Sequence, residues 1–87
     1  MRHMVSFKLI AEHQAEIAAL VPKERAHVAE LRENGTIEEL YLSFENGGLG
    51  WIVMKGESKE EIQRALEAFP LHPYMALEIA TLANMTA

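Results

Sequence analysis

The sequence has 87 residues, of which 49% are hydrophobic and 24% charged, so it predicts one globular domain rather than a disordered chain. It contains no cysteine, which excludes disulfides, thiol nucleophiles and zinc–thiolate sites and makes a reducing cytoplasm the expected compartment. The formal net charge of −5 disfavours nucleic acid as a partner, because phosphate binding needs a basic surface.

The first two elements predicted are a strand and a long helix. Residues 3–10 alternate apolar and polar side chains, the pattern of a strand. Residues 12–34 are rich in Ala, Glu and Leu, and Gly35 is the expected helix terminator. Pro22 interrupts this stretch, so we expect a break or kink there, with Pro22 opening the main helix. The longest apolar run, Ile17 to Val21, is too short to span a membrane, and no secretion signal is expected.

A hairpin is predicted next. From Thr36 the alternation returns, with leucines and a phenylalanine on one side of a strand that reaches Glu45. Residues 45–48 read Glu-Asn-Gly-Gly, and Asn-Gly is typical of tight hairpin turns because it tolerates positive φ. Residues 49–55 then form the returning strand.

The last two elements are a second helix and a final strand. Ser58 to Glu61 has the spacing of a capping box that opens a helix. Pro70 ends that helix, and residues 74–82 alternate again as a strand. The apolar side of the helix is expected to consist of Ile62, Ala65, Leu66 and Phe69.

The order strand, helix, strand, strand, helix, strand predicts an α+β fold in one domain over residues 1–87. The economical arrangement is a four-stranded antiparallel sheet with two helices on one face, the ferredoxin-like plait (βαββαβ). The uncovered face is then expected to mix apolar and polar side chains, including Met4, Ser6, Lys8, Ile10, Tyr41, Ser43, Ala76 and Glu78. Such a face favours burial against another copy of the chain, so we expect self-association.

Glu24 is the most informative candidate for chemistry because it interrupts an apolar helical stripe. The stripe consists of Ile17, Leu20, Val21, Val28 and Leu31. If the helix is continuous, the Glu24 carboxylate points toward the sheet, where burial raises a carboxyl pKa and suits general acid–base catalysis. The alternative is that Glu24 lies at the helix edge, or that the Pro22 kink turns it into solvent.

Other polar residues have weaker signals. His27 follows Glu24 by three residues, so their side chains can meet and share a proton, although the pattern favours an ordinary surface histidine on the helix edge. Lys8 and Glu78 are expected to face each other across the first and last strands, as a carboxylate anchor or as a cross-strand ion pair. The four histidines have no metal-binding spacing, and the glycines of residues 47–50 lie in a hairpin rather than in a phosphate loop.

Several segments together resemble the muconolactone delta-isomerase family over residues 4–82. They are Leu31 to Thr36, Tyr41, Ser58 to Leu66, the passage Phe69-Pro70-Leu71-His72-Pro73-Tyr74-Met75, and Glu78 with Ile79. The resemblance implies a ferredoxin-like domain that assembles through its open sheet face into dimeric α+β barrels and larger rings. It also implies an enzyme without a cofactor that moves a proton across an unsaturated lactone during catabolism of catechol-derived aromatic compounds, in a pocket between the helices and the sheet.

The resemblance also suggests roles for individual residues. Glu24 falls on a glutamate of the family's first helix and is the candidate base, and Lys8 falls on a first-strand lysine and is the candidate carboxylate partner. Beside this resemblance, we expect His27 as a second catalytic residue and His72 and Tyr74 as substrate-binding residues, all of them possible orienting groups. Competing hypotheses are a non-catalytic ligand-binding or structural oligomer and a cofactor-less monooxygenase on the same scaffold.

The second strand departs from the family pattern. Where the family has an aromatic residue followed by basic side chains, this chain has Ile37, Glu38, Glu39 and Leu42. An anionic lactone is therefore expected to meet two additional acids.

Overall fold

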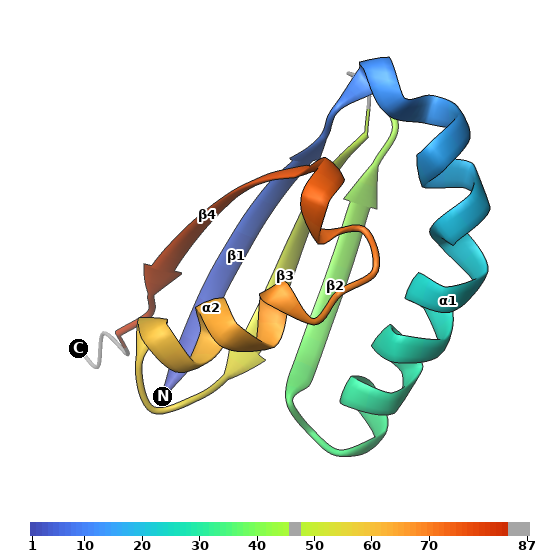
Figure 1. Ribbon diagram of the computed structural model, residues 1–87. Helices are drawn as coiled ribbons and strands as arrows, with labels where there is room; N and C mark the ends of the chain where they lie inside the picture. The colour runs from blue at the N-terminus through green and yellow to red at the C-terminus, as the bar shows by residue number, and fades with distance from the viewer. Residues whose placement is uncertain (46–47, 84–87) are drawn as a thin grey trace.

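The structure, a computed structural model, describes residues 1–45 and 48–83 (Figure 1). The four strands form one antiparallel sheet in the order β2-β3-β1-β4, and the helices α1 and α2 connect its strands as crossovers (Figure 1). The elements in chain order are β1 (Arg2–Leu9), a 3₁₀ turn (Ala11–His13), α1 (Gln14–Glu33), β2 (Ile37–Ser43), β3 (Leu49–Lys55), α2 (Lys59–Glu67), a 3₁₀ turn (His72–Tyr74) and β4 (Met75–Thr81). This is the predicted ferredoxin-like plait.

The predicted break at Pro22 is wrong, because α1 runs without interruption through it. Proline removes one helical N–H, which leaves the carbonyl of Ala18 without its usual partner. Pro22 and Ala18 are both exposed, so water can hydrate that carbonyl and the helix continues. The predicted Asn46-Gly47 turn lies outside the described residues. No helix in the described ranges is long and apolar enough to cross a membrane.

The predicted cap of α2 is confirmed. The Ser58 hydroxyl oxygen accepts a hydrogen bond from the Glu61 backbone N–H at 3.1 Å. The Glu61 carboxylate in turn accepts from the Glu57 N–H at 2.8 Å, one residue before the usual partner of a capping box. Two of the backbone donors around the helix start are therefore satisfied by side chains.

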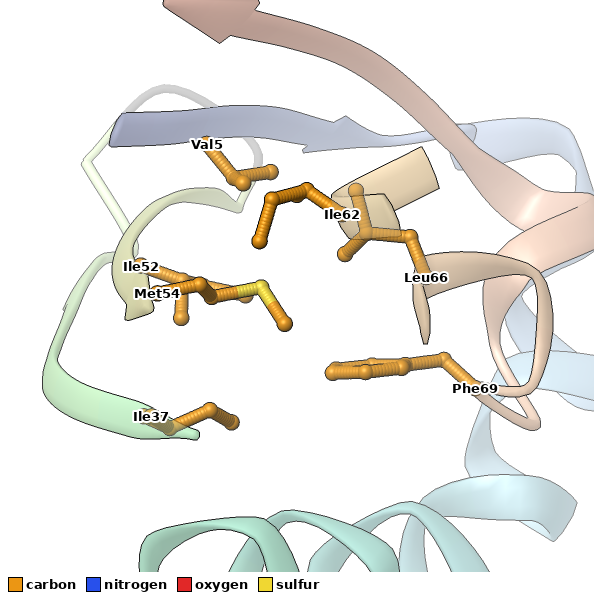
Figure 2. Close-up of a cluster of buried hydrophobic side chains, with 7 residues drawn as sticks. All are labelled: Val5, Ile37, Ile52, Met54, Ile62, Leu66 and Phe69. Carbon is orange, nitrogen blue, oxygen red and sulfur yellow. The ribbon is translucent and has the colours of Figure 1, made fainter. Parts of the chain in front are cut away.

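The core lies between α2 and the sheet. Ile62 and Leu66 of α2, followed by Phe69, point toward the inner side chains of the strands (Figure 2). The buried cluster consists of Val5, Ile37, Ile52, Met54, Ile62, Leu66 and Phe69. Helix α1 is packed differently: Val28 and Leu31 touch this core, but no side chain of α1 is fully buried. Space therefore remains between α1 and the sheet.

The other sheet face is covered by neither helix. Trp51 and Val53 lie on it, and Tyr41 stands opposite Trp51 on β2. The predicted direct pairing of Lys8 with Glu78 is wrong, because the register sets Lys8 opposite Ala76 and Glu78 opposite Ser6. The two charges thus belong to residue pairs that are two apart along the strands, with the pair of Phe7 and Leu77 between them.

Candidate functional site

A cavity of about 390 Å³ lies between α1 and the inner face of the sheet. This volume lies at the lower end of the range for small-molecule pockets. Leu42 and Phe44 line it although 55% and 80% of their surfaces are exposed, so the cavity opens to solvent along the β2 edge. Its apolar wall consists mainly of Phe7, Leu9, Val21, Val28, Leu40, Leu42, Phe44, Leu49, Ile52, Phe69, Leu71 and Met75.

Glu24 lies in the α1 wall of this cavity, between Val21 and Val28 on the same face of the helix. Its Oε1 atom accepts a hydrogen bond from the Leu71 backbone N–H at 3.0 Å. Leu71 is buried in the connection between α2 and β4, so this bond joins α1 to that connection and fixes the carboxyl. The prediction that Glu24 points toward the sheet is confirmed, and the solvent-facing alternative is wrong.

The surroundings of Glu24 change its acidity. Burial raises the pKa of Glu24 above its ordinary value of 4.5, because the apolar walls disfavour the charged form. The hydrogen bond from Leu71 and the nearby His27 imidazole act in the opposite direction and lower this pKa, but burial has the larger effect. The carboxyl is therefore easier to protonate than a solvated glutamate, the property required of a group that accepts and returns a proton.

His27 lies beside Glu24 but does not line the cavity. Its ring packs edge-on against Phe69, with ring centroids 4.9 Å apart and planes at 81°. Its Nε2 atom is buried and has no hydrogen-bond partner among the described residues. His27 therefore acts on Glu24 electrostatically, without a hydrogen bond between their side chains.

The remaining predicted site residues lie outside the cavity wall. Lys8 is exposed on the open face of the sheet, because it alternates with Phe7, which points into the cavity. His72 and Tyr74 belong to the turn before β4, where the Tyr74 ring lies 5.3 Å from that of His13. In the described ranges, no group of three or more His, Asp or Glu side chains could hold a metal ion.

Two arginines of the cavity wall escaped the sequence analysis. Arg25 and Arg32 both line the cavity from α1, beside the face that carries Glu24. Their spacing of seven residues places them on one side of the helix, which was the signal available in the sequence.

The two acids of β2 were expected near the ligand, but they lie outside the cavity. Glu38 pairs with Arg2 at 2.9 Å, Glu39 lies on the open face, and neither lines the cavity. The expected encounter of a ligand with both acids is therefore wrong for a ligand in this cavity.

The family of the chain is identified by comparison with known protein families. The family model described as muconolactone delta-isomerase matches residues 1–86, nearly the whole chain. No curated protein sequence matches the chain closely enough to count as a relative. The chain therefore belongs to the muconolactone delta-isomerase family.

Proposed function

We propose that this member of the muconolactone delta-isomerase family catalyses a proton transfer on a small unsaturated lactone or a related ring compound, without a cofactor. The observation that carries the proposal is the Glu24 carboxyl, held by the Leu71 N–H in the wall of an apolar cavity of small-molecule size. Compounds from aromatic catabolism are the substrate class that family membership suggests. The cysteine-free composition supports a cytoplasmic site of action.

In this proposal Glu24 is both the base and the acid of a 1,3-proton shift. In a conjugated lactone such as muconolactone, the carboxylate removes a proton from the ring carbon at the far end of the allylic system; in an unconjugated enol-lactone it removes the proton beside the carbonyl. Either way the electron pair is delocalised into the same conjugated enolate. The protonated carboxyl then returns the proton to the other end of the allylic system, so that the double bond moves and no atom is lost. A raised pKa suits both half-reactions because the proton is neither held too weakly nor too strongly.

The neighbours of Glu24 have supporting roles in this proposal. His27 stabilises the ionised carboxylate through its nearby imidazole. His72 and Tyr74 lie in the connection between α2 and β4 that also contains Leu71, and they orient the Leu71 N–H toward Glu24, while Lys8 lies on the opposite, open face of the sheet and serves a carboxylate there. The open face itself is proposed to join two copies of the chain into a dimer or a larger ring, because apolar side chains such as Trp51 lie on it uncovered.

Turnover tests the proposal. Purified protein is incubated with muconolactone and with several neutral enol-lactones, and the ultraviolet spectrum follows movement of the double bond. We expect isomerisation of at least one lactone by the wild type and a loss of at least about 100-fold in kcat for Glu24→Gln, the range that general acid–base groups supply. Glu30→Gln, an exposed change on the same helix, is the matched control and should keep full activity.

Two outcomes would contradict the proposal. Absence of turnover on every lactone would favour a non-catalytic ligand-binding protein on the same scaffold. Turnover that persists undiminished in Glu24→Gln would show that another group carries the proton.

A further inference from the structure

Two arginines line a mostly apolar cavity. Arg25 and Arg32 lie in its wall on α1, and both residues are also exposed to solvent. Within residues 1–45 and 48–83, the ion pairs join Arg2 to Glu38 and His13 to Glu16. Neither cavity arginine therefore forms an ion pair with an acid of these described residues.

The charge of the cavity wall is opposite to that of the whole protein. The ionisable groups that line the cavity are Arg25, Arg32 and Glu24, two positive and one negative. The chain as a whole has a formal net charge of −5. A small anion is thus repelled by most of the molecular surface and attracted at this opening, where low-dielectric walls strengthen the attraction.

The spacing of the two arginines suits one planar anion. Seven residues of helix separate their Cα atoms by roughly 10 Å along the axis, and both flexible side chains can converge over the two turns between them. Each guanidinium presents a rigid fork of donors that matches a carboxylate, while its methylene stem packs along the apolar wall. Glu24 directly precedes Arg25 and also lines the cavity. When the arginines hold the carboxylate of a ligand, the ring of that ligand can therefore lie against Glu24, the candidate base.

We propose that Arg25 and Arg32 bind the carboxylate of a small ring compound whose ring occupies the apolar part of the cavity beside Glu24. This α1 pair supplies the positive charge that β2 lacks in this chain, where Glu38 and Glu39 stand outside the cavity. The preferred ligand is therefore a monocarboxylate rather than a neutral lactone. This inference rests on the proposed function for the reaction that follows binding. Binding of the carboxylate by the two arginines can be measured without any turnover.

Binding of an unreactive probe tests the inference. The saturated lactone acid 5-oxotetrahydrofuran-2-acetate lacks the double bond needed for isomerisation, and its methyl ester is the matched neutral probe. Affinities are measured by NMR chemical-shift titration on the full chain. We expect the acid to bind the wild type at least about tenfold more tightly than the ester, with a Kd that weakens as salt rises.

The arginine variants locate the effect. Arg25→Gln and Arg32→Gln should each raise the Kd of the acid about tenfold and leave that of the ester unchanged, because only the acid loses a charge-assisted hydrogen bond. Arg25→Lys should retain part of the affinity. Arg64→Gln, the same charge change on exposed α2, is the control for long-range electrostatics and should have little effect.

The outcomes separate this inference from the proposed function. Equal affinity for acid and ester, no binding of the acid, or an acid Kd that neither arginine variant changes would overturn the inference, even if lactones are turned over. Arginine-dependent binding of the acid in a protein that isomerises nothing would support the inference and contradict the proposed function.

Discussion

Glu24 illustrates how one side chain acquires chemistry from its position. The residue is placed by helical periodicity on the inner face of α1, and its carboxyl is fixed by the Leu71 N–H. Desolvation outweighs the two groups that favour its charged form, so its pKa is raised. A carboxyl of this kind costs the fold some stability at neutral pH and is useful for proton transfer for the same reason.

The first prediction concerns the stability of Glu24→Gln. A folded-state pKa above the unfolded value means that the folded protein binds more protons, so the free energy of unfolding falls as pH rises through the folded-state pKa. Glutamine keeps the acceptor for Leu71 and removes the charge. At pH 7 we expect the variant to be more stable than wild type by less than about 1 kcal/mol, since the half-exposed group is partly screened.

Urea unfolding at pH 4 and pH 7 measures this difference. The advantage of Glu24→Gln should shrink at pH 4, where the wild-type carboxyl is largely protonated. Glu30→Gln, its exposed neighbour on α1, should change stability by no more than about 0.5 kcal/mol. A wild type that is more stable than Glu24→Gln at pH 7 would contradict the raised pKa.

Gly50 gives a second prediction at the scale of one residue. A Cβ atom at this position would lie 2.0 Å from Cζ of Phe7, the residue that pairs with it across the β1–β3 ladder. Gly50→Ala should therefore displace the Phe7 ring, which lines the cavity, and destabilise the fold by about 1–3 kcal/mol.

A double-mutant cycle with Phe7→Ala checks the cause. In urea unfolding, the variant with both changes should lose less stability than the sum of the two single losses, because removal of the ring removes the clash. Additive losses, or a Gly50→Ala variant as stable as wild type, would show that the glycine is not required by the ring.

The two helices differ in how completely they are packed. Helix α2 buries Ile62 and Leu66 in the core, whereas α1 buries no side chain fully and leaves the cavity beneath it. The helix with polar residues on its inner face is thus the helix that stands away from the sheet. The incomplete packing of α1 leaves space for a small ligand between this helix and the sheet.

The same contrast shows what the sequence could predict. Alternation, glycine stops and the Ser58 capping pattern identified every strand and both helices, and the apolar stripe placed Glu24 inward. The continuity of α1 through Pro22 could not be predicted, because it depends on the exposure of the Ala18 carbonyl. Arg25 and Arg32 were missed because an arginine at the border of an apolar stripe has the pattern of an ordinary solvated side chain.

A third prediction tests the cap of α2. Ser58→Ala removes the acceptor for the Glu61 N–H and should lower the free energy of unfolding by about 1 kcal/mol. Ser58→Asp is the matched control, because aspartate supplies an equivalent acceptor and carries a charge suited to a helix N-terminus. Urea unfolding of both variants decides the matter, and an equal loss in the two would show that the hydroxyl does not cap the helix.

At the scale of the whole molecule, the open face of the sheet is covered by neither helix. Trp51 and Val53 lie on it, together with Tyr41, whose hydroxyl donates a hydrogen bond of 2.7 Å to Glu39 on the same strand. This bond to a carboxylate raises the pKa of Tyr41. An apolar centre with a hydrogen-bonded polar border is the composition of an interface between subunits.

The fourth prediction is the mass of the protein in solution. Sedimentation at micromolar concentration should give a multiple of the 9.8 kDa chain. Val53→Lys should shift the mass toward the monomer, because association would bury an unpaired charge. Gln63→Lys adds the same charge on the exposed face of α2 and should leave the mass unchanged. A wild-type mass near that of one chain would contradict assembly through this face.

The most direct test of the central claim is the carboxyl titration of Glu24 by NMR, with Glu24→Gln assigning the resonance. The claim is that this one carboxyl lies in a mostly apolar cavity and is therefore easier to protonate than a solvated glutamate. We expect a midpoint above the 4.5 of an unperturbed glutamate. A midpoint at or below that value would mean that the group is solvated or ion-paired, and Glu24 could not then be the base.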